Sequence, residues 1–267
     1  MTDTRAGIDI SNYQGGPSSY RSAGWYQAAE FVIAQAIPRP VPSGFTNAQL
    51  IGAQEDGKAV GIYTWLWHDP SFRLGDQSVD GDQLARLACV ADTTHVDMRP
   101  WLDVEDNVSP AWSASGVIGR RDDVSRALDV LNDWAAKRGL PEGGMYTSAY
   151  YINLLLDGWT PPGVKLWLAN YGIPAGSILF PPNVVGHQFT SAPIDQDIFL
   201  ESEFMVTSPD PEPVQPANCD GLISSLGYIA GDALAPVVAQ KTKGTKAMQA
   251  LIAAIQHEAD AHGINHA

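Results

Sequence analysis

Two carboxylates set two positions apart, Asp103 and Glu105, stand in the apolar segment Trp-Leu-Asp-Val-Glu. Successive side chains of a β-strand point to opposite faces, so this pair would share one face, with backbone positions about 6.5 to 7 Å apart. Such a pair suits cleavage of a glycosidic bond, in which one carboxyl is the acid and the other stabilises positive charge at the anomeric carbon. Solvated strand surface is the alternative interpretation of so short a motif.

Eight short apolar runs bounded by Gly, Pro and Asp alternate with segments of helical periodicity, a pattern typical of βα units and a parallel sheet. We expect helices at 46–56, 77–91, 121–138 and 149–155, and strands at 6–10, 31–36, 59–67, 101–104, 144–147, 165–170, 184–189 and 194–200. Eight strands in roughly 200 residues favour an α/β fold with a (β/α)8-type TIM-like barrel, regular or irregular, over an open doubly wound sheet.

Catalytic groups of such a barrel lie at the ends of its strands, so the polar residues that bound each apolar run are the candidates. Asp9 ends the first run, Asp103 and Glu105 end the fourth, and Asp195 and Asp197 begin the last. Sugar rings stack on aromatic side chains, and their hydroxyls bond to carboxylates and amides. The aromatic residues near the same run ends are Tyr13, Tyr63, Trp65, Trp67, Trp101, Tyr146, Trp167, Tyr171 and Phe189. Barrel filling is an equally weighted interpretation of Trp65, Tyr146 and Trp167.

Other chemistries have less support in the sequence. A carboxylate cluster can hold Mg²⁺ or Ca²⁺, but the apolar strand beside Trp101 suits a raised carboxyl pKa better than a hydrated ion. The histidines His68, His95 and His187 lack zinc-site spacing, and no Gly-x-Gly-x-x-Gly, phosphate loop or Gly-x-Ser-x-Gly segment is present. We therefore expect no metal and no cofactor.

Composition limits the partners and the location. A chain of 267 residues with 45% hydrophobic content can bury a large core, and its net charge of −14 argues against nucleic acid. The first residues lack the apolar run of a secretory signal, and the apolar stretch at 221–239 is interrupted by Asp232 and Pro236. We expect a chain made in the cytoplasm, without a membrane span, whose two cysteines are free thiols.

The amino-acid composition of the chain changes after Thr207. Residues 208–217 are Pro-rich and acidic, as in an extended linker. Apolar residues then recur at spacings of three and four within 218–267, which predicts two amphipathic helices. We expect a barrel domain at 1–207 and a helical tail that packs on the barrel, self-associates or docks on a virion or tail protein.

Several segments, in order along the chain, resemble glycoside hydrolase family 25, the lysozymes of the N,O-diacetylmuramidase type often found in phage endolysins. They are residues 7–15 (GIDISNYQG), 101–105 (WLDVE), 144–148 (GMYTS), 166–172 (LWLANYG), 188–191 (QFTS) and 194–197 (IDQD). The last of these is similar to the family's Val-Asp-x-Asn. Each segment is weak alone, but together they are in register over residues 6 to about 204.

The resemblance implies a distorted barrel that cleaves the β-1,4 bond between N-acetylmuramic acid and N-acetylglucosamine in bacterial peptidoglycan. Carried over by position, Glu105 would be the general acid and Asp103 would stabilise an oxocarbenium-like or oxazolinium-like species. Asp9 and Asp195 would orient substrate and keep Glu105 protonated. Direct displacement and assistance by the substrate's acetamido group both stay open. The expected substrate contacts are Tyr13, Tyr63, Trp65, Tyr146, Trp167, Asn170 and Gln188.

Two positions depart from the family pattern. Thr64 stands where the family carries histidine, which predicts one altered polar contact with the glycan, and His187 stands where it carries tryptophan. Neither departure removes a carboxylate, so we expect activity.

The expected setting is phage-type cell-wall degradation, either as an endolysin released through holin lesions or as a virion-associated lysin. The competing hypothesis is a catalytically idle carbohydrate-binding or structural virion barrel, because fold alone does not establish function.

Overall fold

The structure is a computed structural model that describes residues 3–36, 44–66, 78–105, 110–179 and 181–204, without the side chains of 44 and 110–115. The linker expected at 208–217, the helical tail expected at 218–267, Trp67 and His68 lie outside the described residues.

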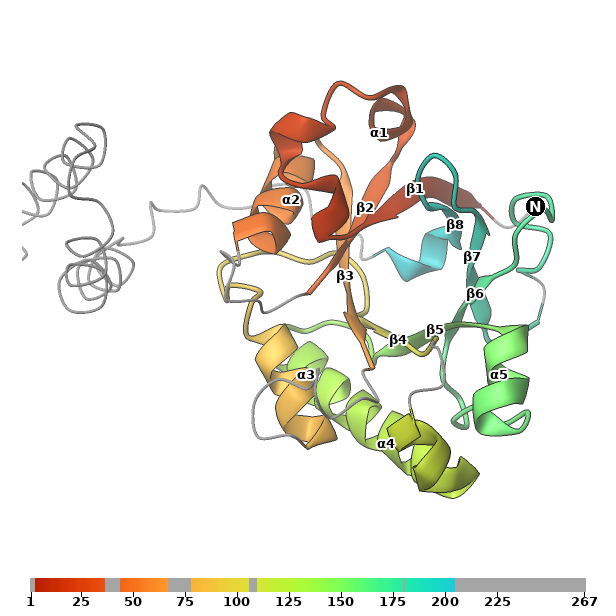
Figure 1. The fold of residues 1–267 in the computed structure, drawn as a ribbon. Coiled ribbons are helices and arrows are strands. Elements are labelled where there is room, and N and C mark those ends of the chain that lie inside the picture. Colours follow the sequence, from red (N-terminus) through yellow and green to blue (C-terminus); the bar gives the residue numbers. More distant parts are fainter. Residues whose placement is uncertain (1–2, 37–43, 67–77, 106–109, 180, 205–267) are drawn as a thin grey trace, which may run out of the picture. The chain divides into compact units, whose positions relative to one another are not determined.

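Eight strands close a barrel in chain order (Figure 1). They are β1 (Thr4–Ile10), β2 (Phe31–Gln35), β3 (Ala59–Trp65), β4 (Trp101–Asp103), β5 (Gly144–Ser148), β6 (Leu166–Ala169), β7 (Val184–Thr190) and β8 (Gln196–Leu200). Every expected strand is found, with its ends displaced by a few residues at most. The apolar runs located the strands because a buried strand must be apolar on both of its faces.

The direction of the last strand corrects the expectation of an all-parallel sheet. Strands β1 to β7 pair in parallel, whereas β8 is antiparallel to both β7 and β1. Only residues 191–195 separate β7 from β8. A connection of that length cannot carry the chain back along the barrel, so it makes a hairpin.

The described helices follow the first five strands: α1 (Gly24–Ala28), α2 (Gly44–Glu55), α3 (Val79–Leu87), α4 (Pro110–Lys137) and α5 (Ala149–Leu156). The four expected helices are confirmed, with α4 longer than expected and kinked at Gly116, whose φ is 65°. The five-residue α1 was not expected, because it is too short to show a helical period. The described segments 170–179 and 181–183, after β6, contain turns and no helix. The barrel is therefore irregular. None of the described helices is long and apolar enough to cross a membrane.

Aromatic rings fill the barrel at the end where the parallel strands begin. Phe31 starts β2, Trp101 starts β4, and Phe199 lies near the end of the antiparallel β8. An added Cβ at Gly7, Gly144 or Gly186 would lie 2.5, 2.2 or 2.4 Å from the nearest atom of one of these rings. The three glycines therefore make room for these rings, which we call the aromatic plug. The plug fills this end of the barrel interior, and the interior is open at the opposite end.

Candidate active site

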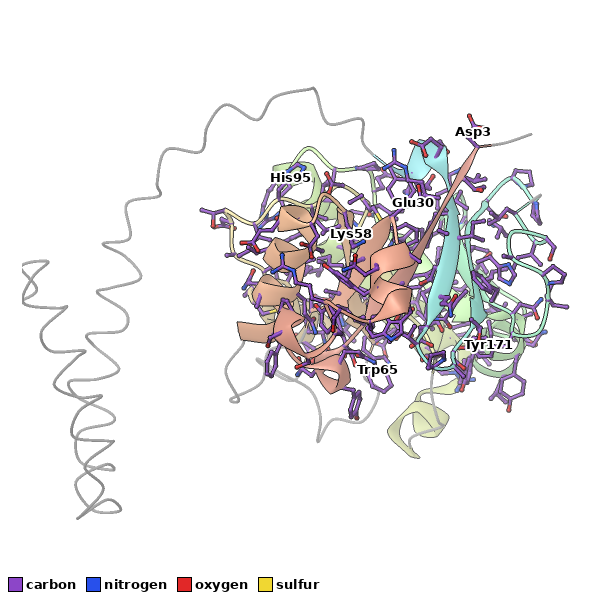
Figure 2. All side chains as sticks on the ribbon, turned by 90° about the horizontal axis from the view of Figure 1, so that it is seen from above. Asp3, Glu30, Lys58, Trp65, His95 and Tyr171 are labelled. Atoms are coloured by element: carbon purple, nitrogen blue, oxygen red, sulfur yellow. The ribbon has the colours of Figure 1, made fainter. Side chains whose placement is uncertain are left out.

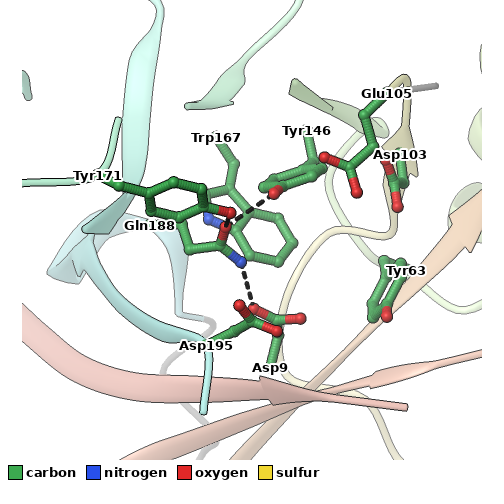
Figure 3. A pocket seen from close by; sticks show the side chains of 9 residues that line it. All are labelled: Asp9, Tyr63, Asp103, Glu105, Tyr146, Trp167, Tyr171, Gln188 and Asp195. Atoms are coloured by element: carbon green, nitrogen blue, oxygen red, sulfur yellow. Dashed lines mark hydrogen bonds between the residues drawn. The ribbon is translucent and has the colours of Figure 1, made fainter. Parts of the chain in front are cut away.

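A pocket opens at the end of the barrel where the parallel strands finish. Figure 2 shows Trp65 and Tyr171 at this end, and Asp3, Glu30 and His95 at the other. The pocket is lined by Asp9, Tyr63, Asp103, Glu105, Tyr146, Trp167, Tyr171, Gln188 and Asp195 (Figure 3). The four carboxylates expected from sequence are therefore brought together, along with four of the seven expected substrate contacts.

The register of neighbouring strands places pocket-lining side chains next to one another. Asp103 pairs with Tyr146 of β5, and Tyr146 pairs with Trp167 of β6. Paired positions on adjacent strands face the same side of the sheet, so all three side chains point into the barrel.

The segment after β4 stays anchored although the strand has ended. The Val104 amide donates to the Tyr146 carbonyl at 2.9 Å, and Thr147 Oγ1 donates to the Val104 carbonyl at 2.7 Å. On the other side, the Leu66 amide donates to the Asp103 carbonyl at 3.0 Å, and Trp65 Nε1 donates to the Glu105 carbonyl at 3.1 Å. These bonds place the half-buried Glu105 at the pocket mouth.

The antiparallel course of β8 brings Asp195 to the same end. Asp195 immediately precedes β8, so in a parallel strand it would lie at the plugged end of the barrel. Because β8 runs the other way, its beginning meets the end of β7, and Asp197 pairs with Gln188. Figure 3 shows Asp195 with Asp9 on one side of the pocket, and Asp103 with Glu105 on the other.

Gln188 is the centre of a buried hydrogen-bond network. Its Oε1 accepts from the hydroxyls of Tyr146 at 2.8 Å and Tyr171 at 2.5 Å, and its Nε2 donates to Asp9 Oδ2 at 2.7 Å. Two hydroxyl donors and a carboxylate acceptor leave one orientation for the amide, with its oxygen toward the tyrosines. The network ties β1, β5 and β7 together at the pocket.

Burial changes the protonation of the acidic set. Loss of water raises the pKa of Asp9 well above its usual value, and the nearby Asp195 raises it further, against the hydrogen bond from Gln188. Burial also raises the pKa of Asp195, to about 6. The site therefore retains protons at mildly acidic pH, where isolated aspartates are ionised.

The tyrosines of the pocket stay neutral. Burial raises the pKa of Tyr63 and Tyr146 well above the usual value for a phenol, and that of Tyr171 to about 12. Negative charge on Asp103 and Glu105 adds to the effect at Tyr63 and Tyr146. The Tyr63 hydroxyl can therefore donate a hydrogen bond to an acceptor in the pocket, while the single hydrogens of Tyr146 and Tyr171 are already donated to Gln188 Oε1.

Trp167 forms the floor of the pocket. Only 1% of its surface is exposed, and its ring centroid lies 4.4 Å from that of Tyr146. Its Nε1 donates to Oδ1 of the buried Asp197 at 2.9 Å. Of the two interpretations weighed for Trp167, core filling describes its packing better than a stacking platform does.

Three residues expected to contact substrate do not line the pocket. Tyr13 lies in the 3-10 helix η1 (Asn12–Gln14) with 94% of its surface exposed. Trp65 is turned to the backbone of Glu105, as described above. Asn170 is exposed, because strand alternation turns it away from the barrel interior that Trp167 faces.

Tyr171 and Asp197 were noted as an aromatic and an acid near the strand ends, but not as substrate-binding or catalytic residues. Tyr171 lines the pocket, and Asp197 lies beneath it, against Trp167. Tyr171 was visible as the last aromatic of the segment Leu-Trp-Leu-Ala-Asn-Tyr. Asp197 was visible as the second acid of Asp-Gln-Asp, two positions after Asp195 and thus on the same face of the strand.

The two departures from the family pattern lie on the outer face of the barrel. Thr64 is buried and alternates with the pocket-lining Tyr63, so it faces away from the pocket. His187 accepts from the Gly176 amide at 3.2 Å and binds the Asn170 carbonyl through Nε2 at 3.1 Å. The expected change in a glycan contact at position 64 is therefore wrong, and His187 supports the loop after β6.

Among the described residues, no group of three or more His, Cys, Asp and Glu side chains is arranged to hold a metal ion.

Comparisons with known proteins give similarity of structure at low identity of sequence. No protein-family model matches the chain, and no curated protein sequence matches it. A muramidase from Acremonium alcalophilum has a TM-score of 0.55 and 17% identity, over 73% of this chain and 93% of that protein. A family GH25 lysozyme from Aspergillus fumigatus has a TM-score of 0.52 and 18% identity, over 74% and 94%.

The modular autolysin LytC from Streptococcus pneumoniae, solved in complex with a synthetic peptidoglycan ligand, is also similar. Its TM-score is 0.53 at 14% identity, over 73% of this chain and 46% of LytC. Structural similarity at such low sequence identity establishes the fold alone. The activity must be argued from the site. The chain has the barrel fold of the family 25 lysozymes and muramidases.

Proposed function

We propose that this chain is a muramidase, a glycoside hydrolase that cleaves the β-1,4 bond between N-acetylmuramic acid and N-acetylglucosamine in peptidoglycan. The observation that carries the proposal is the convergence of Asp9, Asp103, Glu105 and Asp195 on one pocket in a barrel of the lysozyme fold. The peptidoglycan ligand of the structurally similar LytC supports the choice of substrate.

The site suits the chemistry of this reaction. Glu105, at the mouth, is the proposed general acid that protonates the leaving oxygen. Asp103 is the proposed group that stabilises positive charge at the anomeric carbon. Asp9 and Asp195 are proposed to orient the sugar, and Asp195, whose pKa burial raises to about 6, loses its negative charge at mildly acidic pH.

The test is digestion of purified, chemically defined peptidoglycan by the parent and by Glu105→Gln, followed by mass spectrometry of the reduced fragments. Muropeptides that end in reducing muramic acid are expected from the parent. Glu105→Gln should reduce their rate of release at least about 100-fold, because proton transfer to the leaving group contributes that much. The exposed Glu142, before β5, offers a matched control, and Glu142→Gln should digest like the parent.

An inactive parent would contradict the proposal if it is folded and has been tried on walls of several chemotypes. Binding of glycan by that inactive parent would favour the idle carbohydrate-binding barrel instead.

The setting of the activity is a separate part of the proposal. We propose a role in phage-type cell-wall degradation, supported by the likeness of the sequence motifs to a family often found in endolysins. Immunodetection in purified virions and in the soluble fraction of late lysates separates the two forms of that role. Particle-bound protein is expected for a virion-associated lysin and soluble protein for an endolysin, while absence from both would overturn the phage setting.

A further inference from the structure

Asp197 lies beneath the pocket with no exposed surface. It faces into the barrel from β8, between Gly7 of β1 and Gln188 of β7. Its Oδ1 accepts the Trp167 Nε1 hydrogen at 2.9 Å, whereas no donor among the described residues reaches its Oδ2. An ionised carboxylate would leave that buried oxygen without a hydrogen bond, which is costly.

Asp9 is the hydrogen-bond neighbour of Asp197 in the barrel interior. It already receives one donor, the Nε2 of Gln188 at 2.7 Å. The other ionisable groups that act on the pair are Asp195, Glu105 and the neutral Tyr63, and the arginine ion pairs of the described residues are made with other carboxylates. Since no cation of the part of the chain that the structure describes pairs with them, the two buried carboxyls avoid repulsion by holding a proton between them.

The donors already present decide which carboxyl keeps the proton. The hydrogen bond from the Gln188 amide favours negative charge on Asp9. The Oδ2 of Asp197 accepts no hydrogen bond from the described residues, so it can carry the proton as a hydroxyl that donates to Asp9. We propose that Asp197 is a positioning residue held as a neutral carboxylic acid, which donates a hydrogen bond to Asp9 and makes Asp9 the ionised member of the pair.

The electrostatics agree with this assignment. Burial, and then the charge of Asp9, raises the pKa of Asp197 well above its usual value, and the hydrogen bond between them raises it further. The same hydrogen bond lowers the pKa of Asp9. The pair therefore titrates as a unit that loses its first proton from the Asp9 side.

Isotope-edited infrared spectroscopy, with the aspartate carboxyl carbons labelled with ¹³C, tests the proton directly. At pH 7 the parent should show the C=O stretch of a protonated, buried carboxyl. The band should vanish in Asp197→Asn and persist in Asp129→Asn, a control at an exposed aspartate of α4. A parent without the band, or a folded Asp197→Asn that retains it, would overturn the proposal.

The catalytic consequence rests on the proposed muramidase function and is tested separately. Asp197→Asn keeps a neutral donor of the same shape, so kcat should stay within about threefold of the parent with an unchanged pH profile. Asp197→Ala removes the donor and should lower kcat by about 10- to 100-fold. A folded Asp197→Asn that loses as much activity as Asp197→Ala would show that the charge of Asp197 is needed and would sink the idea. The infrared result does not depend on activity, so failure of the muramidase proposal leaves it intact.

Discussion

Gln188 on β7 donates a hydrogen bond to Asp9 on β1 at 2.7 Å, although 179 positions separate the two in the chain. The same amide accepts two tyrosine hydroxyls, so a single side chain holds both an acid of the pocket and two of its aromatic walls. Hydrogen bonds to a charged group are among the stronger ones in proteins, and this one acts on a buried carboxylate.

Gln188→Glu should lower kcat/KM at neutral pH by about 10- to 100-fold, because an ionised glutamate cannot donate to Asp9. Part of the loss should be recovered as the pH falls and the new carboxyl takes up a proton, since it can then donate. Steady-state kinetics from pH 4 to pH 8 measure both effects. Gln27→Glu, on the exposed side of α1, is the control and should leave the profile unchanged; equal activity of the two variants would show that the Gln188 bond is dispensable.

Asp195→Asn should stabilise the protein at neutral pH. The pKa of Asp195 rises from 3.8 to about 6 on folding, so its contribution to stability is present below pH 4 and is lost as the pH rises through 6. The variant should exceed the parent by about 1 kcal/mol in unfolding free energy at pH 7, after allowance for solvent screening, and by less at pH 4.

Urea unfolding of Asp195→Asn at the two pH values measures this difference. Asp129→Asn, at an exposed site on α4, should change the free energy by less than about 0.5 kcal/mol at either pH. If the difference in unfolding free energy between Asp195→Asn and the parent were the same at pH 4 and pH 7, the raised pKa of Asp195 would be refuted.

Gly186→Ala should destabilise the barrel by about 1 to 3 kcal/mol, because its Cβ would press into the Phe199 ring of the aromatic plug. Gly24→Ala in α1 meets no atom within 4 Å and should be neutral, or stabilising by up to about 1 kcal/mol. Thermal unfolding compares the two glycines, and similar melting temperatures would mean that the plug can yield.

Asp82→Asn should cost about 3 to 5 kcal/mol, because it leaves Arg86 buried without its partner carboxylate. Both side chains of this pair, within α3, are only 2% exposed. Asp80→Asn, two positions earlier in α3, breaks a half-exposed pair with Arg126 and should cost less than about 1 kcal/mol. Denaturant unfolding distinguishes the two, and a small cost for Asp82→Asn would mean that water reaches Arg86.

The positions of the strands and of the main acids were readable in the sequence. Apolar runs bounded by turn residues mark buried strands because each strand must hide both faces, and all eight runs form strands. Asp9, Asp103 and Glu105 stand at the ends of such runs, where a barrel collects its functional groups, and all three line the pocket. Apolar runs and the acids at their ends are local features, so they can be recognised in one sequence without knowledge of tertiary contacts.

The direction of β8 and the neighbours of each side chain were decided only by the tertiary structure. Local pattern is the same for a parallel and an antiparallel strand, yet the antiparallel course is what brings Asp195 to the mouth and Asp197 beneath it. The sequence likewise could not distinguish aromatic residues that line the pocket from those that do not. Tyr171 lines the pocket, Trp167 forms the floor of the pocket, and Tyr13 is exposed. Register and barrel closure determine these contacts, because they join residues far apart in sequence whose encounter no local pattern encodes.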